Sequence, residues 1–285
     1  MSMKYQYNLK NDVESVLEIK KINIDVFCEC SGVSKRTLFY SFSHKPSETV
    51  LEKTYSAIYR LGLKINRIKI ELFHESKKQD ELILYHGSKF GICELKLNGS
   101  RFDCDFGPGL YLTQLFPSAI SFVDSYKESS IYAFKIKLKD LKVYEFQSDF
   151  DWMMTISLNR QKINSYKNHQ KIIDIINKIK DADILIGPIA DNKMFEVMQK
   201  FVDGEITDIQ AIHALSASRL GKQFVIKTQK GLDSLVFLDR LYLCKEEKQQ
   251  SLKASKEQEI LIQSKLDFAK RNYRGQGQYI DEVIK

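Results

Sequence analysis

The sequence predicts an α+β protein in which an all-helical N-terminal domain precedes a mixed domain of strands and helices. Three observations indicate this class. Apolar residues recur at helical spacing near the N-terminus; short alternating strands mix with helices, without regular βαβ order, from residue 82 onward; and the charged stretch SKKQDE separates the two patterns. We therefore expect a helical domain at 1–76, a linker at 77–81, a second domain at 82–244, and a polar helix with a tail at 245–285.

The composition is that of a folded protein without a membrane span. Of the 285 residues 43% are hydrophobic and 28% are charged, a balance that excludes disordered and low-complexity chains. No apolar run is long enough for a membrane span or a signal peptide, so we expect a cytoplasmic protein. The net charge of +7 is spread along the chain and permits nucleic-acid contact without arguing for it.

The five cysteines do not form a metal-ligand pattern. They stand at positions 28, 30, 93, 104 and 244, and no second ligand pair lies at zinc-site spacing. We expect reduced, mostly structural thiols and no metal.

The first helices are predicted from periodicity and capping residues. Behind the start signal Asn11–Asp12, Val13, Val16, Leu17 and Ile19 recur at helical spacing up to Ile24.

A tight turn between two short helices follows. Asn23 caps the first of them, in which Val26 and Phe27 should point inward, with Cys28 where the helices cross. Gly32 supplies the turn, Val33 fills the corner, and Ser34 caps a second helix with a polar face.

This pattern resembles the helix-turn-helix of phage repressors, and the run KPSETVLEKTYSAIYRLGL resembles its closing helices. A DNA-binding domain would place Ser34, Lys35, Arg36 and Thr37 at the major groove. The same unit could be a protein-interaction or dimerisation module, because its second helix is rich in aromatic residues and has only two basic ones. Both alternatives stay open.

The second domain should contain seven strands and four intervening helices. The strands are expected at 82–88, 109–113, 130–138, 141–146, 182–190, 223–228 and 234–243. The helices are expected at about 116–127, 164–180, 191–201 and 207–219. The C-terminal part begins as a long polar helix and ends in a Gly-Gln-Gly joint and a short YIDEVI segment.

Four blocks of this domain carry the functional signal, while the common phosphate-loop, dinucleotide, zinc-protease and serine-hydrolase motifs are absent. The blocks are Tyr85-His86-Gly87-Ser88, the run DFGPGLYLT from Asp105 to Thr113, the run DILIGPIAD from Asp183 to Asp191, and the strand that opens with Gln223.

In this order, the blocks resemble an uncharacterised bacterial family of small ADP-ribosyltransferase-like domains of the His-Tyr-Glu (diphtheria toxin/PARP) lineage. The resemblance covers about residues 82–243. It implies a split, antiparallel-rich sheet with flanking helices, and NAD as the substrate without a metal.

The resemblance also implies roles for individual residues. Backbone groups of Gly87 would hold the nicotinamide carboxamide, and the absence of a Cβ allows this close approach. The other expected NAD contacts are His86 to the adenosine-side ribose, Ser88 to a ribose or phosphate, Tyr111 stacked on nicotinamide, Gly109 in the loop before it, and Arg101 at the pyrophosphate. Gly107 and Gly109 should let this loop turn tightly into the strand that carries Tyr111.

Structural explanations stand beside these roles. A histidine at a strand end is often only a surface residue, a Gly-Pro-Gly loop is often only a turn, and a tyrosine in a strand often packs in the core. Asp191 could cap the following helix, and Trp152 is expected to pack rather than to bind a ligand.

The third catalytic element departs from the lineage. Where such transferases open a late strand with Glu, this chain has Gln223, whose amide can accept a hydrogen bond but cannot act as a base. The enzyme could be slow and use a base from its target, an acid such as Glu205 or Asp191 could replace the missing carboxylate, or the domain could only bind NAD.

The expected function is transfer of ADP-ribose from NAD to a macromolecule, protein or nucleic acid, with release of nicotinamide. Behind a repressor-like domain, this activity suggests a bacterial toxin or defence effector restrained by an antitoxin protein. The alternatives are a helix-turn-helix transcription regulator with an inactive NAD-sensing domain, and a purely structural module.

Overall fold

The computed structural model describes residues 6–100, 103–190, 192–215 and 221–284. The chain divides into two compact units. Unit 1 comprises Met1–Glu94, Ala119–Ile136 and Val236–Lys253, and unit 2 comprises Leu95–Ser118, Lys137–Leu235 and Ala254–Lys285. Helices and mixed strands occur in both units, which confirms the predicted α+β class.

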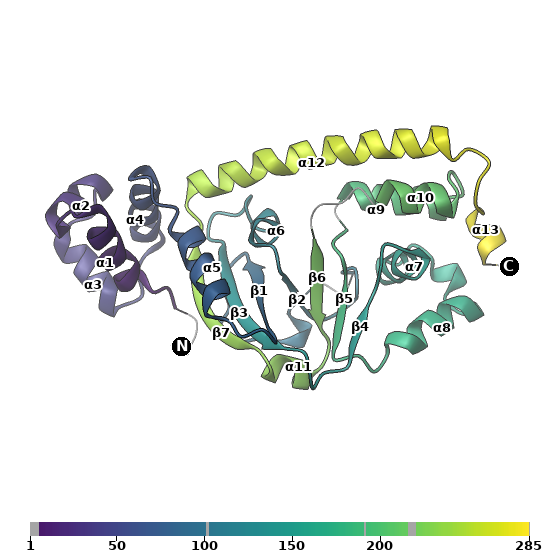
Figure 1. Cartoon of the computed structure of the whole chain (residues 1–285), viewed down its shortest axis with the longest axis horizontal. Helices are drawn as coiled ribbons and strands as arrows, with labels where there is room; N and C mark the ends of the chain where they lie inside the picture. Colours follow the sequence, from purple (N-terminus) through teal and green to yellow (C-terminus); the bar gives the residue numbers. More distant parts are fainter. Residues whose placement is uncertain (1–5, 101–102, 191, 216–220, 285) are drawn as a thin grey trace. The chain divides into compact units, whose positions relative to one another are not determined.

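Unit 1 begins with five helices, of which the first four form a bundle (Figure 1). Their fully buried side chains include Val13, Phe27, Leu38 and Ile58. The bounds are Leu9–Lys20 (α1), Ile24–Ser31 (α2), Lys35–Ser43 (α3), Glu48–Arg60 (α4) and Ile65–Ser76 (α5).

The turn between α2 and α3 confirms the local predictions. Asn23 and Ser34 cap their helices through hydrogen bonds from the backbone N–H groups of Val26 and Thr37. Gly32 has a φ of 62°, in the left-handed region, and ends α2. Val33 is buried in the corner.

One prediction for α2 is wrong. Val26 is 40% exposed, whereas Phe27 is fully buried. The buried stripe of this short helix runs through Phe27 and Ser31, four positions apart on one face. Val26 is one position earlier, about 100° around the helix axis, and therefore turns away from the core.

Three strands complete unit 1, in the order β1-β3-β7. They are β1 (Glu81–Ser88), β3 (Ser130–Lys137) and β7 (Val236–Tyr242). β3 and β7 are antiparallel, with a register shift between Ala133 and Phe134. α5 ends at Ser76 and β1 begins at Glu81, so the predicted linker at 77–81 lies between two elements except for its last residue, Glu81. The domain boundary itself stays a prediction.

The helices and β7 share one hydrophobic core within unit 1. Tyr242 and Cys244 are buried in the same cluster as the apolar residues of α1 to α4. A buried charge cluster lies beside it, in which the Lys69 ammonium contacts the carboxylates of Asp12 at 2.5 Å and Asp239 at 2.8 Å. Both hydrophobic and ionic contacts therefore join the N-terminal helices to β7.

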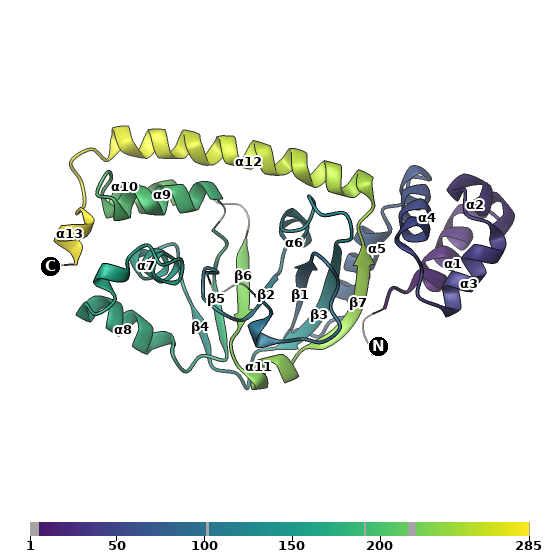
Figure 2. The same cartoon turned by 180° about the vertical axis from the view of Figure 1, so that it is seen from behind.

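Unit 2 contains four neighbouring strands in the order β4-β5-β6-β2 (Figure 2). They are β2 (Leu110–Thr113), β4 (Val143–Glu145), β5 (Ile184–Pro188) and β6 (Lys222–Ile226). β4 and β5 are parallel, whereas β6 is antiparallel to both β5 and β2. All seven predicted strands are present, with shifts of one to a few residues at their ends.

The helices of unit 2 differ more from the predictions. They are α7 (Phe150–Asn159), α8 (Gln170–Ile179), α9 (Asn192–Val202), α10 (Asp208–Leu215), α11 (Gln229–Asp233), α13 (Ile280–Val283) and the short 3-10 turns Leu97–Gly99 and Asn164–Tyr166. The helix expected at 116–127 is shorter (α6, Phe116–Ser121), and only its first residues, up to Ser118, belong to unit 2. The helix expected at 164–180 is divided into a 3-10 turn and α8.

α7 was not predicted because it is buried on most sides. Trp152, Met153, Met154 and Ile156 are all buried, so no polar face alternates with an apolar one.

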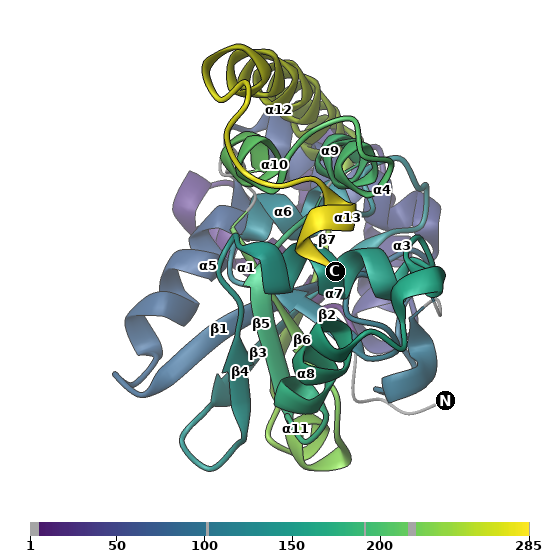
Figure 3. The same ribbon diagram turned by 90° about the vertical axis from the view of Figure 1, so that its right-hand side faces the viewer.

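The long polar helix expected at the C-terminus is α12 (Lys245–Asn272). Within unit 2, its C-terminal half lies along α10 (Figure 3). Leu266 and Ala269 are buried there, and the Gln210 amide donates to the Lys270 carbonyl. Among the described helices, none combines the length and the apolar character that a membrane span requires.

Candidate functional site

Two predicted site residues lie together in unit 2 because β2 pairs with β6. Tyr111 is opposite Val225, and Thr113 is opposite Gln223. Directly paired residues share a face of the sheet, and so do residues two apart along one strand. Tyr111 and Gln223 therefore occupy diagonal positions on one face of unit 2.

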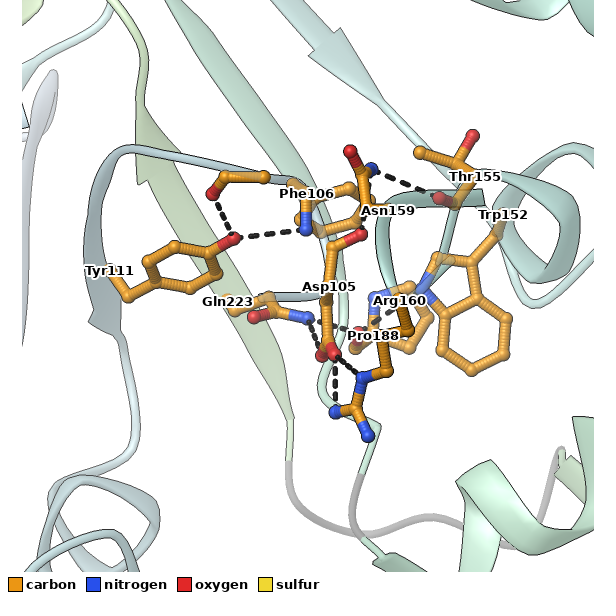
Figure 4. A network of polar contacts seen from close by, with 10 residues as sticks. Asp105, Phe106, Tyr111, Trp152, Thr155, Asn159, Arg160, Pro188 and Gln223 are labelled. Carbon is orange, nitrogen blue, oxygen red and sulfur yellow. Dashed lines mark hydrogen bonds and ion pairs between the residues drawn. The ribbon is translucent and has the colours of Figure 1, made fainter. Parts of the chain in front are cut away.

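The side chain of Gln223 is buried, at 4% exposure, and its amide nitrogen has two acceptors. It donates to the Asp105 carboxylate at 3.0 Å and to the Pro188 carbonyl at 3.1 Å (Figure 4). Both neighbours are acceptors, so the atom that faces them must be the NH₂ group. The amide oxygen points away from Asp105, on the side of the view where Tyr111 lies.

Asp105 is the centre of this polar cluster. One carboxylate oxygen accepts from Nε and Nη2 of Arg160, with 2.9 Å from Nε, while the other accepts from Gln223. The backbone carbonyl of Asp105 accepts from the Asn159 amide at 3.0 Å. Arg160 follows the last residue of α7 and its guanidinium covers the Phe195 ring at 4.3 Å. The end of α7 thus holds Asp105 in place.

The hydroxyl of Tyr111 is fully engaged by the loop before β2. It donates to the Gly107 carbonyl at 2.7 Å and accepts from the Phe106 N–H at 2.9 Å. Burial raises the pKa of this hydroxyl well above its ordinary value. The expected stacking on nicotinamide would use the ring, and the hydroxyl has a separate structural role.

The loop needs glycine at two positions, for a different physical reason at each. Gly107 has a φ of 69°, which favours glycine. Gly109 lies so close to β6 that a Cβ would be 2.7 Å from a methyl carbon of Val225 and 2.8 Å from the Ile226 carbonyl oxygen.

Lys227, the residue after β6, holds the same loop. Its ammonium donates to the carbonyls of Phe106 at 2.7 Å and Pro108 at 2.6 Å. Desolvation lowers the pKa of this lysine, whose positive charge is directed at backbone oxygens. Two cations, Arg160 and Lys227, therefore hold the segment that carries Asp105.

His86, Gly87 and Ser88 end β1 in unit 1, where all three are partly buried. A Cβ on Gly87 would lie 2.6 Å from the Ala119 carbonyl oxygen and 3.0 Å from a methyl carbon of Val123. Close packing within unit 1 therefore requires glycine here in any case, and the expected carboxamide contact of Gly87 stays a prediction.

The remaining predicted residues have varied positions. Arg101 and Asp191 lie outside the described residues. Glu205 is exposed and pairs with Lys200 at 3.1 Å. Trp152 is fully buried, which confirms its packing role, and its indole N–H donates to the Pro188 carbonyl.

Asp183, at the start of the third block, has structural partners. It accepts hydrogen bonds from the Thr228 hydroxyl at 2.6 Å and the Lys142 N–H at 2.9 Å. The Thr228 hydrogen bond is the main cause that lowers the pKa of Asp183. This carboxylate thus joins the segments before β4, β5 and α11.

The four candidate DNA contacts are exposed at the start of α3. The hydroxyls of Ser34 and Thr37 bond each other at 2.7 Å, and the Lys35 ammonium pairs with Asp25 at 2.9 Å. Arg36 is exposed on the first turn of the same helix.

A pocket of about 320 Å³ lies in unit 2 beside the loop. Apolar side chains of α7 and α8 form most of its wall, and Phe106, Asn159 and Lys227 also line it. Tyr111 and Gln223 do not line this pocket. In the described part of the chain, no three His, Cys, Asp or Glu side chains gather as a metal site.

Two important residues, Asp105 and Arg160, were missed by the sequence analysis. The motif that contains Asp105 assigns it no role, and its position before the Phe-Gly-Pro-Gly turn is the available signal. Arg160 had no signal, because it ends the helix that lacked periodicity.

Unit 2 thus defines an α+β protein with a buried amide–carboxylate–guanidinium cluster beside a tyrosine on one sheet face. Residues 82–237, more than half of the chain, match the family described as "Protein of unknown function (DUF3990)". The chain belongs to the DUF3990 family. No curated protein and no solved structure matches it.

Proposed function

We propose that this protein is an NAD-dependent ADP-ribosyltransferase. The observation that carries the proposal is the placement of Tyr111 and Gln223 on one face of two paired strands, inside the family segment. Tyrosine and a late-strand polar residue are two of the three elements that the His-Tyr-Glu resemblance requires. His86, the third, ends β1.

The reaction divides NAD at the glycosidic bond of nicotinamide. The bond between C1′ of the ribose and the nicotinamide nitrogen breaks, and its electron pair leaves with nicotinamide. C1′ then bonds to a nucleophilic atom of the acceptor, which releases its proton to solvent. The Tyr111 ring would hold nicotinamide, and His86 the adenosine-side ribose.

The acceptor is a macromolecule, either protein or nucleic acid, and the setting is the bacterial cytoplasm. The N-terminal helices would hold an antitoxin protein or DNA. Two exposed aromatic residues on α3, Phe39 at 50% and Tyr40 at 61%, favour a protein partner. DNA is less favoured, because the Lys35 ammonium is already paired with Asp25.

The proposed activity is tested with NAD that carries a label on its adenylate phosphate. Purified protein and a bacterial lysate are incubated with this NAD, and label is followed into protein and nucleic-acid fractions. Transfer should disappear in His86→Ala and Tyr111→Ala and persist in Tyr126→Ala, an exposed tyrosine control.

Two outcomes have distinct meanings. Label in either fraction, lost in both site variants, supports the transferase. NAD binding in calorimetry without label or nicotinamide release supports the alternative of an NAD-sensing regulator. That alternative also requires salt-dependent binding of a DNA duplex, weakened in Arg36→Ala.

A further inference from the structure

We propose that Asp105 is a positioning residue that fixes the amide of Gln223 with its oxygen outward, as the acceptor for the 2′-hydroxyl of the nicotinamide ribose. This inference rests on the proposed transferase function. At position 223, where the lineage has a carboxylate, this chain would then present an amide oxygen whose direction is fixed.

The direction of the Gln223 amide follows from its two acceptors. Its nitrogen lies 3.0 Å from an Asp105 carboxylate oxygen and 3.1 Å from the Pro188 carbonyl oxygen. If the amide rotated by 180°, its own oxygen would face both of these oxygens, with no hydrogen between them. Two hydrogen bonds would be lost in a buried place, so the observed orientation is strongly favoured.

The amide oxygen remains available in this orientation. It accepts no hydrogen bond from the described residues. Figure 4 shows this oxygen on the opposite side of the amide from Asp105.

Arg160 binds only one of the two oxygens of the Asp105 carboxylate. Both contacting guanidinium nitrogens bond to Oδ1, which leaves Oδ2 for Gln223. Arg160 can only donate, so the atom at the Oδ1 position must be an acceptor. The orientation of Asp105, and through it the orientation of Gln223, is therefore set by the end of α7.

The same arrangement explains why a glutamine is present. A glutamate at position 223 would place a second carboxylate about 3 Å from that of Asp105, and carboxylates so close share a proton instead of both ionising. The ion pair of Asp105 with Arg160 has no net charge. The cluster therefore offers the substrate a neutral acceptor.

Asp105→Asn tests the inference with almost no change of shape. Arg160 would still need an acceptor, so the new amide would direct its NH₂ toward Gln223. The Gln223 amide would then rotate to accept this bond, lose its hydrogen bond to the Pro188 carbonyl, and present its own NH₂ to the ribose hydroxyl. As positive charge develops at C1′, the 2′-hydroxyl becomes a stronger donor, so loss of the acceptor should lower kcat more than it raises KM.

The measured reaction is NAD hydrolysis to nicotinamide by the full chain. Asp105→Asn should lower kcat about tenfold or more, the effect of one lost hydrogen bond in the transition state. The double variant Asp105→Asn/Gln223→Glu should recover most of this loss, because the amide at 105 would donate to the new carboxylate. In Gln223→Glu alone, kcat should show a new ionisation at raised pH, which the double variant shifts to lower pH.

Asp183→Asn is the matched control. Asp183 is also a buried carboxylate of unit 2 that accepts two hydrogen bonds. It precedes β5, whereas Gln223 pairs with Gly187 near the other end of that strand. The Asp183→Asn protein should be less stable than the wild type but should have the same kcat.

The outcomes separate the two proposals. Wild-type protein that neither binds nor hydrolyses NAD overturns the proposed function, and this inference with it. Wild-type hydrolysis with unchanged kcat in Asp105→Asn, or a double variant no faster than Asp105→Asn, overturns only the positioning role. A selective fall of kcat followed by recovery in the double variant supports it.

Discussion

The amide of Gln223 donates a hydrogen bond to the carboxylate of Asp105 at 3.0 Å, across 118 positions of sequence. Under the proposed function, Gln223 is the residue at which this chain departs from the His-Tyr-Glu pattern, and Asp105 begins the block that contains Tyr111. The departure therefore has a physical partner. The two blocks are joined by this buried contact.

Tyr111→Phe should separate the two roles of this tyrosine. The ring stays, but the Gly107 carbonyl and the Phe106 N–H lose their partner, which should cost about 1–3 kcal/mol of unfolding free energy. NAD turnover should fall far less than in Tyr111→Ala. Urea unfolding and NAD hydrolysis measure the two effects; equal loss of turnover in both variants would contradict the separation.

Gly187→Ala should damage the site through packing. A Cβ there would lie 2.7 Å from Cζ of Phe106 and 3.3 Å from Cδ1 of Trp152, which should cost about 1–3 kcal/mol as overpacking. Because Phe106 follows Asp105, turnover should fall as well. The control is Gly99→Ala, where a Cβ meets no atom within 4 Å. Thermal unfolding measures the melting temperature of both variants, and equal values would contradict the prediction.

Lys69→Met should strongly destabilise unit 1. The buried carboxylates of Asp12 and Asp239 would lose their shared cation, at a cost of about 3–5 kcal/mol. Desolvation already raises the pKa of Asp239, and this rise should increase without Lys69. The variant should therefore regain stability as the pH falls and Asp239 takes up a proton.

Urea unfolding of Lys69→Met at pH 7 and pH 4 measures this effect. The control is Lys10→Met, whose exposed pair with Glu14 at 3.7 Å should contribute little. Equal stability of the two variants at pH 7 would show that the buried cluster does not hold α1, α5 and β7 together.

Asp183→Asn should make unit 2 less stable in a pH-dependent way. The folded pKa of Asp183 is lowered from 3.8, chiefly by the Thr228 hydrogen bond. Its ionised form therefore stabilises the fold above pH 3.8, and this stabilisation is lost as the pH falls through the lowered value. The free energy of unfolding of the wild-type protein should exceed that of the variant by about 1–3 kcal/mol at pH 7 and by less at pH 3.

The matched control for that comparison is Asp233→Asn, an exposed carboxylate of the same unit that accepts only from the Gln229 amide among the described residues. It should change the urea midpoint little at either pH. A stability difference for Asp183→Asn that does not depend on pH would contradict the role given to its charge.

Local features were predictable from the sequence. The caps at Asn23 and Ser34, the turn at Gly32 and the strand that contains Tyr111 depend on residues within a few positions of each other. Backbone conformation, capping bonds and side-chain alternation act over that range, so their patterns are visible in the printed order. The DUF3990 match over 82–237 coincides with the stretch singled out by its motifs, while the transferase activity stays a prediction.

The tertiary structure decided what depends on distant segments. Val26 turned outward because the short helix buries a different face, and α7 was hidden from periodicity because nearly all its faces are covered. The partners of Gln223 come from the loop at Asp105 and the end of β5, placed there by strand register, and Arg160 comes from α7. Hydrogen bonds between residues so far apart leave no period or spacing in a single sequence, since only the packed sheet brings them within 3 Å.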